Sequence, residues 1–129
     1  MDTPGRTASQ AGDLIRQFNH DTINASDNWQ YPAQAYHAIG GLAYMVRMLP
    51  QAIEQTMLPV DRTHKKGRVT VDSGRDPEQA VTELRAATRE AVQYARLLSA
   101  AVDRMHSAAS PLGLNTRGLP EFDDEDDDR

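Results

Sequence analysis

The side chains with the greatest capacity for chemistry are four histidines: His20, His37, His64 and His106. The Asp-x-x-His spacing of Asp103 and His106 places both side chains on one helix face, where they could ligate a metal ion. In a helical hairpin, His37 would come within a turn or two of this pair. Metal sites in helical bundles, however, draw carboxylates from several helices, and the helix that carries His37 has only Glu54. We therefore expect surface histidines at the hairpin base and no metal ion.

Other signatures of catalysis are missing from the sequence. There is no Gly-rich phosphate loop and no nucleophile elbow. The chain has no cysteine, which removes thiolate nucleophiles, thiolate metal sites and disulfides, and which suits a reducing cytosol. These observations predict a protein that is not an enzyme, needs no cofactor and is cytoplasmic.

Positive charge gathers in the predicted connection between two helices, residues 59–75. The residues of this basic loop are Arg62, Lys65, Lys66 and Arg68. Four cations could contact phosphates, but no aromatic side chain lies among them to stack on a base. The net charge of −5 also disfavours a nucleic-acid partner, so a solvated loop is the simpler interpretation. Residues 68–72 have the composition of a brief strand.

Negative charge gathers at the other end of the chain. Residues 121–129 hold seven carboxylates and one arginine, a charge of −6, which leaves about +1 for residues 1–120. Such a run repels itself, so we expect residues 114–129 to form a disordered acidic tail. Three roles are open: solubility, docking onto a basic partner, or folding back over the basic loop with Phe122 as an anchor.

The elements that position these residues are two long amphipathic helices. One begins at Asp76-Pro77, where an aspartate cap precedes a proline in the first turn, and its apolar spacing of three and four continues to Ala109. The other has the same rhythm from Pro32 to about Leu58. The spacing therefore predicts helices over residues 77–109 and 32–58, paired as an antiparallel hairpin.

A register in which paired residue numbers sum to about 137 makes every layer of the hairpin apolar or small. The predicted pairs are Ile39 with Leu98, Leu42 with Ala95, Val46 with Ala91, Leu49 with Thr88, and Ile53 with Leu84. The same register places Arg47 near Glu90 and Glu54 near Arg85. Large side chains then face alanine and threonine, so the predicted core is thin.

A second apolar stripe lies beside this seam and would otherwise face water. Its main members are Gly41, Met45, Met48, Tyr94 and Leu97, which we take as the candidate interaction surface. A third, shorter helix over residues 8–25, after a flexible N-terminus at residues 1–7, could cover only part of it. Self-association into a bundle, most simply as a dimer, would complete the burial, and a partner protein is the other possibility.

Three residues break local rules within the first long helix. Gly40 and Gly41 each weaken a helix by roughly 1 kcal/mol relative to alanine, and Pro50 lacks a backbone donor. Close approach of another helix is the favoured explanation for the glycines, with a hinge or a partner contact as the alternative. Pro50 predicts either a kink or the start of a separate short helix at Leu49-Pro50-Gln51.

The sequence therefore predicts an all-α protein: a long antiparallel helical hairpin with an additional N-terminal helix, as a three-helix or dimeric bundle. No stretch approaches the roughly 18 apolar residues that cross a bilayer, and the N-terminus lacks an export signal. The expected function is that of a noncatalytic interaction protein, an adaptor, assembly factor or regulator that acts through apolar helix faces. The alternative is a nucleic-acid-associated accessory protein whose acidic tail competes for its basic loop.

Overall fold

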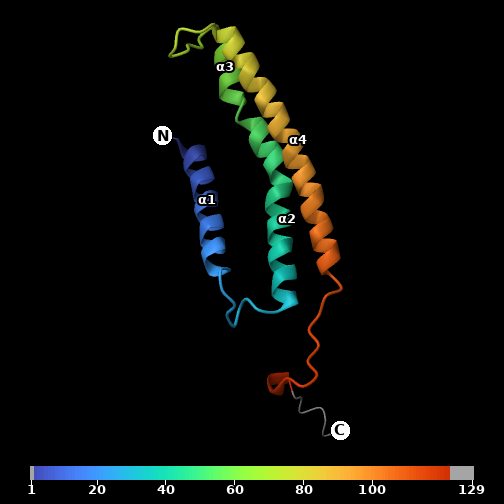
Figure 1. Cartoon of the computed structure of the whole chain (residues 1–129). Coiled ribbons are helices and arrows are strands. Elements are labelled where there is room, and N and C mark those ends of the chain that lie inside the picture. The colour runs from blue at the N-terminus through green and yellow to red at the C-terminus, as the bar shows by residue number, and fades with distance from the viewer. Residues whose placement is uncertain (1, 123–129) are drawn as a thin grey trace. The chain divides into compact units, whose positions relative to one another are not determined.

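The computed structural model describes residues 2–122, and they form an all-α protein, as predicted (Figure 1). The helices are α1 (Thr3–Asp21), α2 (Pro32–Gln55), α3 (Leu58–Lys65) and α4 (Pro77–Ala109), followed by a 3₁₀ turn at Pro120–Phe122. No α-helix in this part of the chain has the length and apolar character to span a bilayer. The tail predicted at residues 114–129 falls outside the described residues from 123 onward.

The chain divides into two compact units. One contains residues 36–112, that is, most of α2 together with α3 and α4. The other contains the residues up to Ala35 and those from Gly113 onward. We call the first the hairpin unit and the second the terminal unit.

Helix α4 has the bounds that its sequence predicts, Pro77–Ala109. The Asp76 carboxylate accepts a hydrogen bond from the backbone N–H of Glu78, and Pro77 occupies the first turn, where its missing N–H costs nothing. At the C-terminal end, the N–H of Ser110 still donates to the carbonyl of His106. A helix of this length forms one entire arm of the hairpin.

The opposite arm is α2 followed by α3, which corrects the predicted loop over residues 59–75. Residues 58–65 are helical, because Pro59 lies in the first turn of a new helix and does not terminate the previous one. The break between the two helices is at Thr56 and Met57, not at Leu49-Pro50-Gln51, and α2 continues through Pro50. The true connection is residues 66–76, and it contains no strand at 68–72.

The register of the hairpin also differs from the prediction. Val46 belongs to a buried cluster with Ala43 and Val102, whereas the prediction paired it with Ala91. The difference between positions 91 and 102 is eleven residues, about three helical turns, so the same faces meet in both registers. The continuation of the arm through α3 moves the turn toward the C-terminus and thereby selects the later register.

The core of the hairpin unit is thin, as predicted, but for a different reason. Its buried residues are Ala43, Val46, Met57, Val81, Val92, Ala95, Val102 and Ala109. All but one are alanine or valine, while the leucines at 84 and 98, which the predicted register placed in the seam, are 44% and 49% exposed. Small side chains therefore fill the space between the arms, and several large ones remain at the surface.

Gly40 and Gly41 differ in their surroundings. A Cβ at Gly40 would lie 3.2 Å from Nε2 of His106, whereas a Cβ at Gly41 would meet nothing within 4 Å. The His106 ring stacks on Tyr36, with 4.3 Å between centroids and 7° between planes. The close approach expected at this pair of glycines is thus made by Gly40, against α4.

This difference gives a direct test. We expect Gly41→Ala to raise the free energy of unfolding by up to about 1 kcal/mol, because alanine favours helix and has open space there. Gly40→Ala should gain less or lose stability, because its methyl group displaces the stacked His106 ring. Urea unfolding followed by circular dichroism measures both variants. Equal gains would contradict the packing of His106 over Gly40.

In the terminal unit, α1 begins earlier than predicted, because its cap resembles that of α4. The Asp2 carboxylate accepts from the N–H of Gly5 at 2.8 Å, and Pro4 lies in the first turn. Residues 3–7, predicted to be flexible, therefore belong to the helix. It ends at Asp21, short of the predicted residue 25, where the Thr22 hydroxyl donates back to the carbonyl of Phe18 at 2.8 Å.

Aromatic pairs organise the rest of the terminal unit. Trp29 packs edge-on against Phe18 with centroids 5.9 Å apart, and Tyr31 packs edge-on against Phe122 at 5.7 Å. Each such pair contributes about 0.5–1.5 kcal/mol beyond its buried area. Within the terminal unit, the ring of Phe122 therefore packs on Tyr31.

Candidate functional site

The two sides of the hairpin unit carry different chemistry. On α4, the buried seam is formed by Val81, Ala95 and Val102. The side chains on one side of this seam are apolar, and those on the other side are charged. We call these two surfaces the apolar flank and the charged flank. Both belong to one compact unit, so each is a defined arrangement of side chains.

The apolar flank consists of Met45 and Met48 on α2 and of Leu84, Tyr94, Leu98 and Met105 on α4. On α4, Tyr94 is 61% exposed, Leu98 49% and Met105 51%. On α2, Met48 is 48% exposed and Met45 is half-buried. Helical periodicity therefore brings four of these side chains from α4 and two from α2 to one side of the hairpin.

The candidate interaction surface predicted from sequence overlaps with this flank without matching it. Met45, Met48 and Tyr94 belong to it, and Gly41 is an exposed backbone position on the same side of α2. Leu97, 59% exposed, lies farther around α4 from the seam than Leu98. The prediction placed Leu98 inside the seam, whereas the structure leaves it half exposed beside the buried Ala95 and Val102.

The charged flank joins the two arms by ion pairs. Arg47 contacts Asp103 at 3.3 Å, Arg96 contacts Glu54 at 3.4 Å, and Arg85 contacts Asp61 at 2.8 Å. These replace the predicted pairs of Arg47 with Glu90 and of Glu54 with Arg85. All six side chains are at least one-third exposed, so each pair contributes at most about 1 kcal/mol and mainly fixes which residues face each other.

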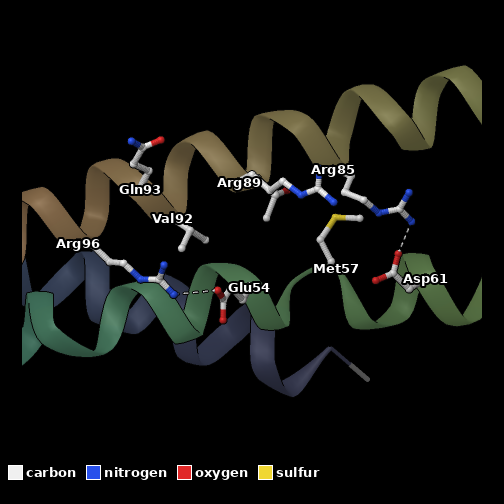
Figure 2. Close-up of a pocket in the computed structure, with 9 residues that line it drawn as sticks. Glu54, Met57, Asp61, Arg85, Arg89, Val92, Gln93 and Arg96 are labelled. Atoms are coloured by element: carbon white, nitrogen blue, oxygen red, sulfur yellow. Dashed lines mark hydrogen bonds and ion pairs between the residues drawn. The ribbon is translucent and has the colours of Figure 1, made fainter.

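An open groove of about 590 Å³ lies on the charged flank where α2 breaks before α3 (Figure 2). Met57 and Val92, both buried, form its apolar base. Three guanidinium groups line it, those of Arg85, Arg89 and Arg96. Figure 2 shows Arg89 placed along α4 between the other two, which reach Asp61 and Glu54 on the opposite arm.

Within residues 2–122, Arg89 has no hydrogen-bond or ion-pair partner, whereas its two neighbours each have one. The groove was not predicted from the sequence. Its signal is the row Arg85, Arg89, Gln93 and Arg96, whose spacings of four, four and three place the four side chains on one face of a helix. The apolar base has no such signal, because it depends on where α2 breaks.

Two of the four histidines, His64 and His106, make defined contacts, whereas His20 and His37 are exposed. Nε2 of His64 is 2.6 Å from the Glu78 carboxylate, across the end of the hairpin, and His106 stacks on Tyr36. Asp103 is already paired with Arg47. Among the residues that the structure describes, no group of three or more acidic or histidine side chains is placed to hold a metal ion.

The basic segment is divided between a helix and a turn. Arg62 and Lys65 lie on α3, Lys66 ends that helix and Arg68 follows it, and all four are exposed. Near them, Arg75 donates to the Glu83 carboxylate at 2.7 Å, and this hydrogen bond, with the charge of Glu83, raises the pKa of Arg75. The predicted basic loop is therefore the exposed tip of the hairpin.

No family model, curated protein or solved structure proved similar to this chain.

Proposed function

We propose that the protein is a noncatalytic helical interaction protein that assembles through the apolar flank of its hairpin unit. It forms a homo-oligomer, most simply a dimer, and in this way serves as an adaptor, assembly factor or regulator of another protein. The proposal places contact, not chemistry, at the centre of the function.

One observation carries the proposal: large apolar side chains stay exposed on a hairpin whose core is small. Leu84, Tyr94, Leu98 and Met105 are between 44% and 61% exposed, while the buried seam is alanine and valine apart from Met57. Burial of an apolar side chain stabilises by about 1.5–3 kcal/mol, so covering several of them outweighs the contribution of most surface ion pairs. A second helical surface placed on this flank supplies the missing burial.

The solution mass tests the proposal. Light scattering coupled to size exclusion should give twice the chain mass or more at micromolar concentration, with dissociation on dilution. A monomer at all concentrations would move the proposal to a different partner protein. If, in addition, the wild-type chain and a Leu98→Glu variant capture the same proteins, the proposal is refuted.

A nucleic-acid accessory role is the second candidate, and the exposure of the basic tip favours it. Arg62, Lys65, Lys66 and Arg68 have no ion-pair partner within residues 2–122. Deletion of residues 121–129 separates the two candidates. Absence of binding to single-stranded and duplex DNA at low salt, even after this deletion, would exclude the second role.

A further inference from the structure

We propose that the groove at the break between α2 and α3 binds a small monocarboxylate with an apolar body. The site is distinct from the apolar flank, because the groove lies on the charged flank on the other side of the seam. The proposal therefore goes beyond assembly and assigns a ligand chemistry to the hairpin unit.

The net charge of the groove suits a ligand that carries one negative charge. Its three arginines and two carboxylates give a net charge of +1. Arg85 and Arg96 are engaged with Asp61 and Glu54, and this leaves the guanidinium of Arg89 as the donor without a partner in the described chain. A guanidinium presents parallel N–H groups that fit a carboxylate in two-point contact.

The flanking carboxylates argue against a polyanion. A nucleic-acid backbone or a polyphosphate placed on Arg89 would bring several negative charges toward Glu54 and Asp61, which lie on both sides of it along the groove. These carboxylates would repel the additional negative charges of a polyanion, and this repulsion favours a ligand with a single charged group.

The apolar base of the groove favours a ligand that has an apolar body beside its carboxylate. Met57 and Val92 are 7% and 5% exposed and line the groove below the arginines. A hydrocarbon chain there removes its own surface from water, while its carboxylate reaches Arg89. The volume of about 590 Å³ lies in the range of small-molecule sites.

Hexanoate is the probe that tests the proposal, with titration followed by two-dimensional ¹H–¹⁵N NMR of the full chain. The expected result is saturable binding with a dissociation constant of about 1–10 mM, as suits a ligand of this size. The Nε–Hε signal of Arg89 should shift, together with the backbone signals of Met57 and Val92. Acetate, which lacks the apolar body, and hexanol, which lacks the charge, should each bind at least about tenfold more weakly.

Arg89→Gln should weaken hexanoate binding about tenfold, because the charge-assisted contact is lost. It should leave the thermal unfolding curve unchanged, because Arg89 has no partner in the described structure. Arg104→Gln is the matched control: it removes the same charge from an exposed position of α4 outside the groove, and it should bind hexanoate like the wild type. Equal weakening in both variants, or shifts spread over all arginines, would overturn the proposal.

Two further ligands identify the source of the carboxylate. Acetyl-Ala-Leu-Ala with a free C-terminus represents a polypeptide end, and its C-terminal amide lacks the charge. Tighter binding of the free peptide than of hexanoate identifies a polypeptide carboxylate, and the reverse identifies a free organic acid. Tighter binding of hexyl phosphate than of hexanoate would overturn the assignment of a monocarboxylate.

Discussion

Val102→Asp is expected to lower the free energy of unfolding by more than about 3 kcal/mol. Val102 is 8% exposed and packs in the seam with Ala43 and Val46. The substitution removes apolar burial and places a carboxylate in this apolar cluster, and both changes are costly. A unit with so thin a core has little stability in reserve. Far-UV circular dichroism at 25 °C, with thermal unfolding, measures the result.

Ala100→Asp is the matched control, because it adds the same carboxylate to the same helix at an exposed position. Its effect should stay below about 1 kcal/mol, because at this exposed position aspartate loses only the helix preference of alanine. Similar losses of stability in both variants would contradict the observed seam, because they would mean that Val102 is no more buried than Ala100.

The elements were predictable because their signals are local. Asp76 and Pro77 mark the start of α4 by capping and by a preset backbone angle, and neither depends on the rest of the fold. The same combination, an aspartate cap at Asp2 and a proline in the first turn at Pro4, marks the start of α1. Pro59 was ambiguous, because a proline after an apolar residue ends one helix or begins the next, and only packing decides.

The register was not predictable from periodicity, because periodicity survives a shift of three turns. Both registers bring Val46 onto the seam face of the other arm, against Ala91 in one and Val102 in the other. The two registers differ in the length of the arm that contains α3. That length depends on whether Pro59 ends one helix or begins the next. The groove was unpredictable for the same reason. The spacing of its arginines is visible in the sequence, but Met57 lines its base only because α2 breaks there.

The second large effect concerns assembly. We expect the double substitution Leu98→Glu with Met105→Glu to weaken self-association at least about a hundredfold. Both side chains are about half exposed, at 49% and 51%, and lie on the apolar flank seven residues apart. Association buries them, so each glutamate both removes apolar contact and requires a carboxylate to lose water. A hundredfold change corresponds to about 2.8 kcal/mol, a modest estimate for two such sites.

The matched control is the double substitution Ala100→Glu with Ser107→Glu. Both positions are exposed, they also lie seven residues apart on α4, and they face the charged side of the hairpin. The net charge of the two double variants is the same, so a general repulsion between acidic chains affects both equally. Sedimentation equilibrium over a range of concentrations measures the dissociation constants. Self-association lost only in the variant of the apolar flank assigns assembly to that surface. Equal loss in both variants would mean that net charge, not burial, governs association, and the proposed role of this flank would fail.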